Sequence, residues 1–146
     1  MKKITLLTVL LFSLAVFTAC DTLNKLPTNT SGGIFSLNGN WKLTSSSDNN
    51  AEAGTVVTVT PALTIAYVRT LGTNNSYCYR TNDEAWKSIS SLSAGGFSIS
   101  YLAGACSGNP TYNAGQITVI TNNHIRINTK TTGNIALTQE WDRVVN

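Results

Sequence analysis

Residues 117–128 read Ile-Thr-Val-Ile-Thr-Asn-Asn-His-Ile-Arg-Ile-Asn and carry the clearest structural signal in the chain. Apolar and polar residues alternate on both sides of the Asn122-Asn123 pair, for example at Ile125 and Ile127. A period of two is typical of a half-buried β-strand, and the Asn-Asn pair suits a tight turn. The stretch therefore predicts two antiparallel strands joined as a hairpin.

The same pattern continues on both sides of this hairpin. β-Branched residues fill positions 55–60, and alternating runs follow at 63–68, 97–101 and 135–143. Gly and Asn turns separate the runs, so that about eight short strands fit after residue 36. Because a closed sheet has no exposed edges, we expect an all-β fold, a small antiparallel up-and-down β-barrel.

One segment of this pattern suits a helix as well as a strand. Residues 81–84 (Thr-Asn-Asp-Glu) resemble a helix capping box, and Ala85, Trp86 and Ile89 follow at helical spacing. The same residues also suit a short strand. We favour the strand because a meander leaves little room for a helix at this point.

The composition predicts one folded domain without a nucleic-acid partner. The 146 residues are enough for a single domain, and 42 % apolar with 12 % charged residues argues against disorder. Two of the ten Lys and Arg residues, Lys2 and Lys3, lie in the leader, so eight remain against seven Asp and Glu. No basic stripe is left to bind nucleic acid. We also expect the domain to be monomeric.

Residues 1–19 have the features of a lipoprotein signal peptide. A basic start precedes an apolar segment that is too short for an easy membrane span. The segment ends in Phe-Thr-Ala-Cys at 17–20, which resembles a bacterial lipobox, whose Cys is diacylated and becomes the new N-terminus. The resemblance implies a membrane anchor of acyl chains, such as palmitate, on Cys20 in the bacterial cell envelope, and we favour the outer membrane. An ordinary signal peptide with a free Cys20 is the alternative.

Residues 20–36 are expected to form a tether. They are rich in Thr, Asn and Gly, and they show no apolar period. The barrel domain is then expected to span residues 37–146.

The two remaining cysteines, Cys78 and Cys106, are expected to form a structural disulfide. A signal peptide places them beyond the inner membrane, where disulfides persist. The pair closes a loop that the chain-entropy model values at about 3.5 kcal/mol. A redox-active pair usually has Cys-x-x-Cys spacing, which these residues lack.

The two ends of the predicted barrel carry a recognisable pair of motifs. Residues 37–43 (Leu-Asn-Gly-Asn-Trp-Lys-Leu) resemble the Gly-x-Trp opening of lipocalin-like proteins, and residues 137–144 resemble their last strand. The closest resemblance is to lipocalin-like domains of small bacterial lipoproteins. It implies that Gly39, Trp41 and Arg143 close the barrel, with the arginine packed across the tryptophan.

The alternating apolar face suggests an interior that either holds a small ligand or is simply packed. An eight-stranded barrel is at the size where both occur. Gln139 interrupts this face, so it needs a hydrogen-bond partner in the core or on a ligand. The candidate cavity residues are Tyr67, Phe97, Tyr101 and Gln139.

No arrangement of catalytic residues is recognisable in the sequence. His124 is the one histidine, and it lies on a polar face beside a turn, where contact with solvent is more common than catalysis. Glu140 and Asp142 share the strand face opposite Trp141, which we expect to face solvent. A single histidine excludes metal sites built on several imidazoles, and no phosphate-binding Gly-rich loop occurs. We expect no enzyme activity, no metal and no cofactor.

Two functions remain open. The first is a membrane-anchored lipocalin-like binder of a small apolar or amphipathic molecule. The second is a protein-interaction module, such as an envelope inhibitor of a hydrolase similar to lysozyme inhibitors. In the second case the barrel would be filled, and loops 72–76 and 103–110 would make the contacts.

Overall fold

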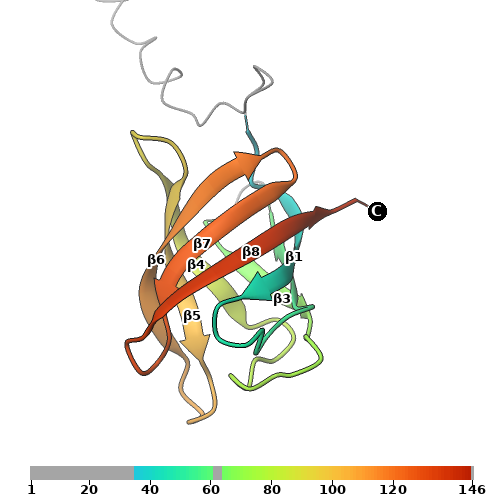
Figure 1. The fold of residues 1–146 in the computed structure, drawn as a ribbon, viewed down its shortest axis with the longest axis vertical. Helices are drawn as coiled ribbons and strands as arrows, with labels where there is room; N and C mark the ends of the chain where they lie inside the picture. Colours follow the sequence, from blue (N-terminus) through green and yellow to red (C-terminus); the bar gives the residue numbers. More distant parts are fainter. Residues whose placement is uncertain (1–34, 61–63, 146) are drawn as a thin grey trace, which may run out of the picture.

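The computed structural model describes residues 35–60 and 64–145 (Figure 1). The expected signal peptide, Cys20 and most of the expected tether lie outside these residues. Every regular element in the described part of the chain is a strand. That part contains no helix long and apolar enough to cross a membrane.

Eight strands form one closed antiparallel sheet. Each strand pairs with the next along the chain, and the last pairs back with the first, so the expected up-and-down barrel is confirmed. The strands are β1 (Gly39–Ser46), β2 (Val56–Val59), β3 (Ala66–Thr70), β4 (Glu84–Ser91), β5 (Phe97–Gly104), β6 (Thr111–Thr121), β7 (His124–Lys130) and β8 (Ala136–Val144).

The hairpin predicted from residues 117–128 is present as β6, a turn and β7. Ile117 pairs with Ile127 across the two strands, and the turn falls at Asn122 and Asn123. Ile117, Ile125 and Ile127 are fully buried. The period-two pattern therefore gives the correct face toward the core.

Most of the ambiguous segment is a strand, as expected: β4 begins at Glu84, and residues 81–83 form the turn before it. The Asp83 carboxylate accepts the backbone N–H of Arg80, so it stabilises a turn before β4 rather than a helix N-terminus. The register of β4 against β5 then shifts between Lys87 and Ser90. This bulge lets Trp86 and Ile89, three positions apart, both reach the core, and the spacing therefore imitates a helix.

The expected inward face is wrong in β3. Ala66 and Val68 are fully buried, and Tyr67 between them is half-exposed on the outside of the barrel. A shift of one residue turns every side chain of a strand to the other face. The small Ala66 occupies a place where the sequence suggested a large aromatic ring.

Side chains fill the centre of the barrel. The indoles of Trp86 and Trp141 meet edge to face, with ring centroids 5.2 Å apart. A residue beside a ligand-sized void would keep surface accessible to water, and the central residues keep almost none. Those with at most 1 % of their surface exposed include Trp41, Leu43, Val57, Val68, Trp86, Ile117, Ile125, Ile127, Leu137 and Gln139.

The end of the barrel at which the described chain begins is closed by Trp41 and Arg143, and we call it the plugged end. The two residues pair across β1 and β8, and the Arg143 guanidinium carbon lies 4.3 Å from the Trp41 ring centroid. The guanidinium also donates hydrogen bonds to the carbonyls of Ser36 and Asn38. Gly39 leaves room for it, because a Cβ there would lie 3.0 Å from the guanidinium. A cation–π contact and hydrogen bonds thus join the first strand to the last.

The core begins earlier than the sequence suggested. Phe35 is 4 % exposed and packs against Trp41 and Phe97, with ring centroids 6.2 and 6.0 Å apart. The expected tether ran to residue 36, so its last two positions belong to the folded domain. No periodic pattern marks Phe35, because it precedes the first strand.

Replacing Trp41 by Ala should lower the free energy of unfolding by about 3–5 kcal/mol, because it empties the plugged end. Ile135→Ala serves as the control, since Ile135 is 68 % exposed and its loss should change stability by less than about 0.5 kcal/mol. Urea unfolding of the wild type, Trp41→Ala and Ile135→Ala measures the two changes in the free energy of unfolding. A loss below about 1 kcal/mol for Trp41→Ala would contradict the described packing.

Candidate functional site

Four loops gather at the end of the barrel opposite the plugged end (lower end of Figure 1). They are the connections that follow β1, β3, β5 and β7, because alternate connections of an up-and-down barrel share one end. We call this the loop end. Its loops are 47–55, 71–83, 105–110 and 131–135.

A disulfide joins two of these loops. Cys78 and Cys106 are bonded with their Cα atoms 4.9 Å apart, which confirms the pairing expected from the sequence. Next to the bond, the backbone N–H of Ala105 donates to the carbonyl of Tyr77 at 2.8 Å. The loops after β3 and β5 are therefore fixed to one another by a covalent bond and a hydrogen bond.

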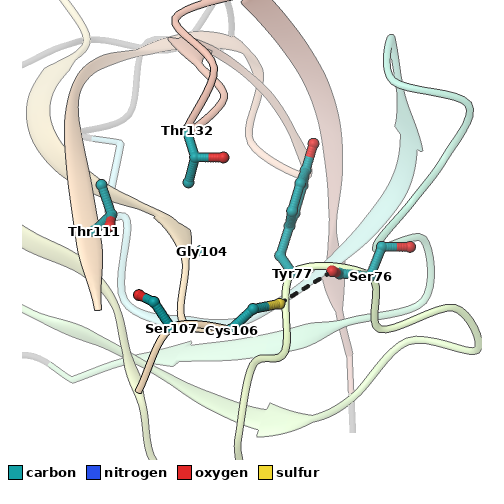
Figure 2. Close-up of a pocket in the computed structure, with 7 residues that line it drawn as sticks. All are labelled: Ser76, Tyr77, Gly104, Cys106, Ser107, Thr111 and Thr132. Carbon is teal, nitrogen blue, oxygen red and sulfur yellow. Dashed lines mark hydrogen bonds between the residues drawn. The ribbon is translucent and has the colours of Figure 1, made fainter. Parts of the chain in front are cut away.

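Beside the disulfide lies an open cavity of about 430 Å³ (Figure 2). This volume is within the usual range for pockets that bind small molecules. The cavity is lined by Tyr77, Gly104, Cys106 and four hydroxyl-bearing residues, Ser76, Ser107, Thr111 and Thr132.

Tyr77, the aromatic wall of this cavity, is held by two carboxyl groups from the loop after β1. Its backbone N–H donates to Glu52 Oε1 at 2.7 Å, and its hydroxyl donates to Asp48 Oδ2 at 2.6 Å. Burial, followed by the hydrogen bond to Asp48, raises the pKa of the Tyr77 hydroxyl above its ordinary value. The phenol therefore stays neutral and keeps its proton as a donor to Asp48.

Glu52 is a buried carboxyl group inside a loop. It is 1 % exposed, and its Oε2 atom has no hydrogen-bond partner among the described residues. Burial first, and the nearby Asp48 as a smaller cause, raise the pKa of Glu52 from 4.5 to about 7. Gly72 packs so closely beneath this loop that a Cβ there would lie 2.5 Å from the Ala53 carbonyl oxygen. The two loops are thus in direct backbone contact around the carboxyl group.

The stability contribution of Glu52 should decrease as the pH rises from about 4.5 to about 7. Over this interval the unfolded chain has lost the proton that the folded protein still holds, so raising the pH favours unfolding. The free energy of unfolding should fall by an amount on the order of 3 kcal/mol over this pH range, and the Glu52→Gln variant should not show this decrease. Urea unfolding across this pH range measures it, with Glu84→Gln on the surface of β4 as control. Parallel pH curves for wild type and Glu52→Gln would contradict the burial of this carboxyl group.

A chain of hydrogen bonds links four polar side chains inside the barrel, whereas Nε1 of the buried Trp86 has no hydrogen-bond partner among the described residues. Trp141 Nε1 donates to Gln139 Oε1 at 3.2 Å, and Gln139 Nε2 donates to the hydroxyl of Tyr101 at 2.9 Å. The Tyr79 hydroxyl donates to the carbonyl of Leu102 at 2.6 Å, so the Tyr101 hydroxyl, 3.1 Å away, donates to Tyr79. Burial raises the pKa of both phenols, which keeps them neutral. Gln139 therefore has partners within the core.

The four candidate cavity residues do not form one site. Gln139 and Tyr101 are bonded to each other inside the barrel. Phe97 packs against Phe35 at the plugged end, and Tyr67 lies on the outside. None of them contributes to the cavity at the loop end.

His124 lies on the outer surface of β7 between two carboxylates of β8. Its Nδ1 atom is 2.6 Å from Asp142 Oδ1, and its Nε2 atom is 3.0 Å from Glu140 Oε2. Arg126 pairs with the second oxygen of Glu140 at 2.6 Å. The histidine thus lies between two carboxylates in a polar network on the surface, whereas the sequence suggested a ring in contact with solvent. Since each carboxylate meets a different ring nitrogen, the three groups do not converge on one ion, and the described residues hold no metal-binding cluster of three or more such side chains.

The sequence predicted part of this site. It indicated loops 72–76 and 103–110, which supply Ser76 and Cys106 to the cavity. It missed Asp48 and Glu52, because a carboxyl group buried within a loop leaves no periodic signal. A signal was available for Thr132, because the predicted meander places the loop after β7 at the same end as the disulfide.

Comparisons of the chain with protein-family models, curated proteins and solved structures gave no match. Function must therefore be argued from the geometry of the loop end and of the barrel interior.

Proposed function

We propose that the protein is a membrane-anchored, non-enzymatic binding module of the bacterial envelope, with a lipocalin-like barrel that takes its ligand at the loop end. The proposed anchor is a set of acyl chains on Cys20. The observation that carries the proposal is the filled barrel, which leaves binding to the surface of the domain, where the loop end carries the cavity of about 430 Å³. The disulfide stiffens this end, as a binding surface requires.

The filled interior argues against the first function suggested by the sequence, a carrier of an apolar molecule inside the barrel. Such a molecule would have to displace the Trp86–Trp141 pair and the hydrogen-bonded Gln139. Removing Gln139 from its partners would leave buried polar groups unsatisfied, at about 1–3 kcal/mol each. Binding outside the barrel has no such cost.

The place at which the chain enters the domain also favours binding at the loop end. Phe35 lies at the plugged end, and the proposed anchor at Cys20 precedes it by a short segment. The proposed tether then joins the domain at the plugged end. The loop end carries no attachment to the anchor, so a ligand or a partner has access to it.

A second candidate is the docking of a protein partner at the same end, as in an inhibitor of a hydrolase. Ile135 favours it, because this residue is 68 % exposed in the loop that also supplies Thr132 to the cavity. An exposed isoleucine on a loop is a suitable apolar anchor for an interface.

Native mass spectrometry of the full chain, purified from the membranes of its own host, tests the proposal. A bound mass of a small molecule should be present in the wild type and in Thr118→Trp on the outer face of β6. It should be lost in Thr111→Trp, because this side chain fills the cavity. Cys20→Ser should move the protein to the soluble fraction with its disulfide intact.

Two results would contradict the proposal. A bound mass that survives Thr111→Trp would mean that binding occurs elsewhere on the molecule. A Cys20→Ser protein that stays in the membrane fraction would remove the anchor. A bound polypeptide that is lost on Ile135→Ser would instead support the second candidate.

A further inference from the structure

The cavity at the loop end has one aromatic wall and no charged side chain in its lining. Figure 2 shows Tyr77 on one side of the cavity and Thr111 and Thr132 on the other. The ring of Tyr77 is seen nearly edge-on, so that one face is turned toward the space between them. The cavity therefore offers a flat apolar surface opposite a group of hydroxyls.

Two of these hydroxyls are free to bind a ligand. Within residues 35–60 and 64–145, neither the Thr111 nor the Thr132 hydroxyl makes a hydrogen bond to another residue, and both threonines are exposed. Ser107 donates to the carbonyl of Asn109, and its oxygen keeps lone pairs as an acceptor. The lining thus presents both donors and acceptors, each uncharged.

The aromatic wall is held in position before any ligand binds. Glu52 fixes the Tyr77 backbone, Asp48 fixes the far end of the ring, and Cys78 ties the loop to Cys106. A ring that is already ordered loses little entropy on binding, which favours its use as a stacking surface. The hydroxyl of Tyr77 is occupied by Asp48, and the ring offers the ligand its face.

Gly104 keeps the floor of the cavity open. It lies at the end of β5 between Tyr77 and Thr132, and a Cβ added there would approach the Thr132 methyl group to 3.0 Å. A larger side chain at this position would enter the cavity or displace Thr132. The absence of a side chain is thus what preserves the space between the two walls.

The chemistry of the lining excludes most classes of ligand. An apolar molecule would leave the threonine hydroxyls buried without partners. An anion would meet no cation in the lining, and the carboxyl groups of Asp48 and Glu52 lie behind Tyr77. A quaternary ammonium ion is usually held by several aromatic rings, and the lining contains one. A neutral molecule with hydroxyls on its edge and C–H groups on its face fits all the lining groups.

We propose that the loop-end cavity binds a neutral saccharide, with one pyranose ring stacked on Tyr77 and its hydroxyls bonded to Thr111 and Thr132. This inference rests on the proposed binding at the loop end and names the chemical class of its ligand. The ring face of the sugar carries partly positive C–H groups, which the electron-rich face of a tyrosine attracts. Its hydroxyls match the uncharged donors and acceptors of the two threonines.

An NMR titration with methyl glucoside, methyl galactoside and methyl mannoside tests this inference. The sample is the ¹⁵N-labelled full chain with Cys20→Ser, which avoids detergent. At least one glycoside should shift the amide signals of loops 71–83 and 105–110 saturably, with a dissociation constant on the order of 1 mM. Glucuronate, which has the same ring with a negative charge, should bind more weakly.

Two variants of β6 provide the matched comparison. Thr111→Val keeps the shape of the side chain and removes one hydroxyl, so it should weaken binding about three- to tenfold. Thr118→Val makes the same change on the outer face of the strand and should leave the dissociation constant unchanged. Tyr77→Leu, which removes the stacking surface, should weaken binding by more than about tenfold.

The inference is overturned if no glycoside gives a saturable shift at the loop end, or if Thr111→Val and Thr118→Val bind equally well. Thr111→Val is expected to fold normally because Thr111 is exposed at the start of β6, so the test does not depend on Tyr77→Leu. If the glycosides fail while a native bound mass is still lost in Thr111→Trp, the saccharide is wrong and binding at the loop end stands. If the native mass also survives Thr111→Trp, both are wrong.

Discussion

The pairing of β1 with β8 is the contact on which the rest of the structure depends. It joins residues about a hundred positions apart, and Trp41 and Arg143 lie opposite each other within it. Once this pair forms, the sheet has no free edge and every strand has two neighbours. The Arg143 guanidinium covers the Trp41 ring, so the contact that closes the sheet also closes one end of the core. Closure thus fixes both the topology and the position of the plug.

Closure with eight strands also limits what the protein can bind. A barrel of this size has an interior just large enough to be filled by side chains, and here Trp86, Trp141 and Gln139 occupy its centre. The side chain of Gln139 is hydrogen-bonded to Tyr101 and Trp141, and opening the core to a ligand would break these hydrogen bonds. The cavity of about 430 Å³ therefore lies at the loop end, where the Cys78–Cys106 bond holds two of the loops together.

The sequence predicts the barrel well because its main signals are local. The alternation around Ile125 and Ile127 identifies strands and their inner faces. The disulfide is predicted because Cys78 and Cys106 are the two cysteines that remain after Cys20 is assigned to the anchor. Prediction fails where the deciding contact is distant or irregular. Tyr67 lies outside the barrel although the sequence predicts it inside, because alternation alone does not show which of two registers a short strand adopts. The sequence pattern does not indicate that Glu52 is buried, because its burial results from the packing of one loop on another.

Titration of the Cys20→Ser full chain with a fluorescent polyene fatty acid tests the filled barrel most directly. We expect no saturable rise in fatty-acid fluorescence and no loss of tryptophan emission, because the space around Trp86 and Trp141 is occupied. Saturable uptake with energy transfer from the tryptophans would mean that the interior opens to an apolar molecule. That result would mean that the barrel is not filled and that the ligand binds inside it.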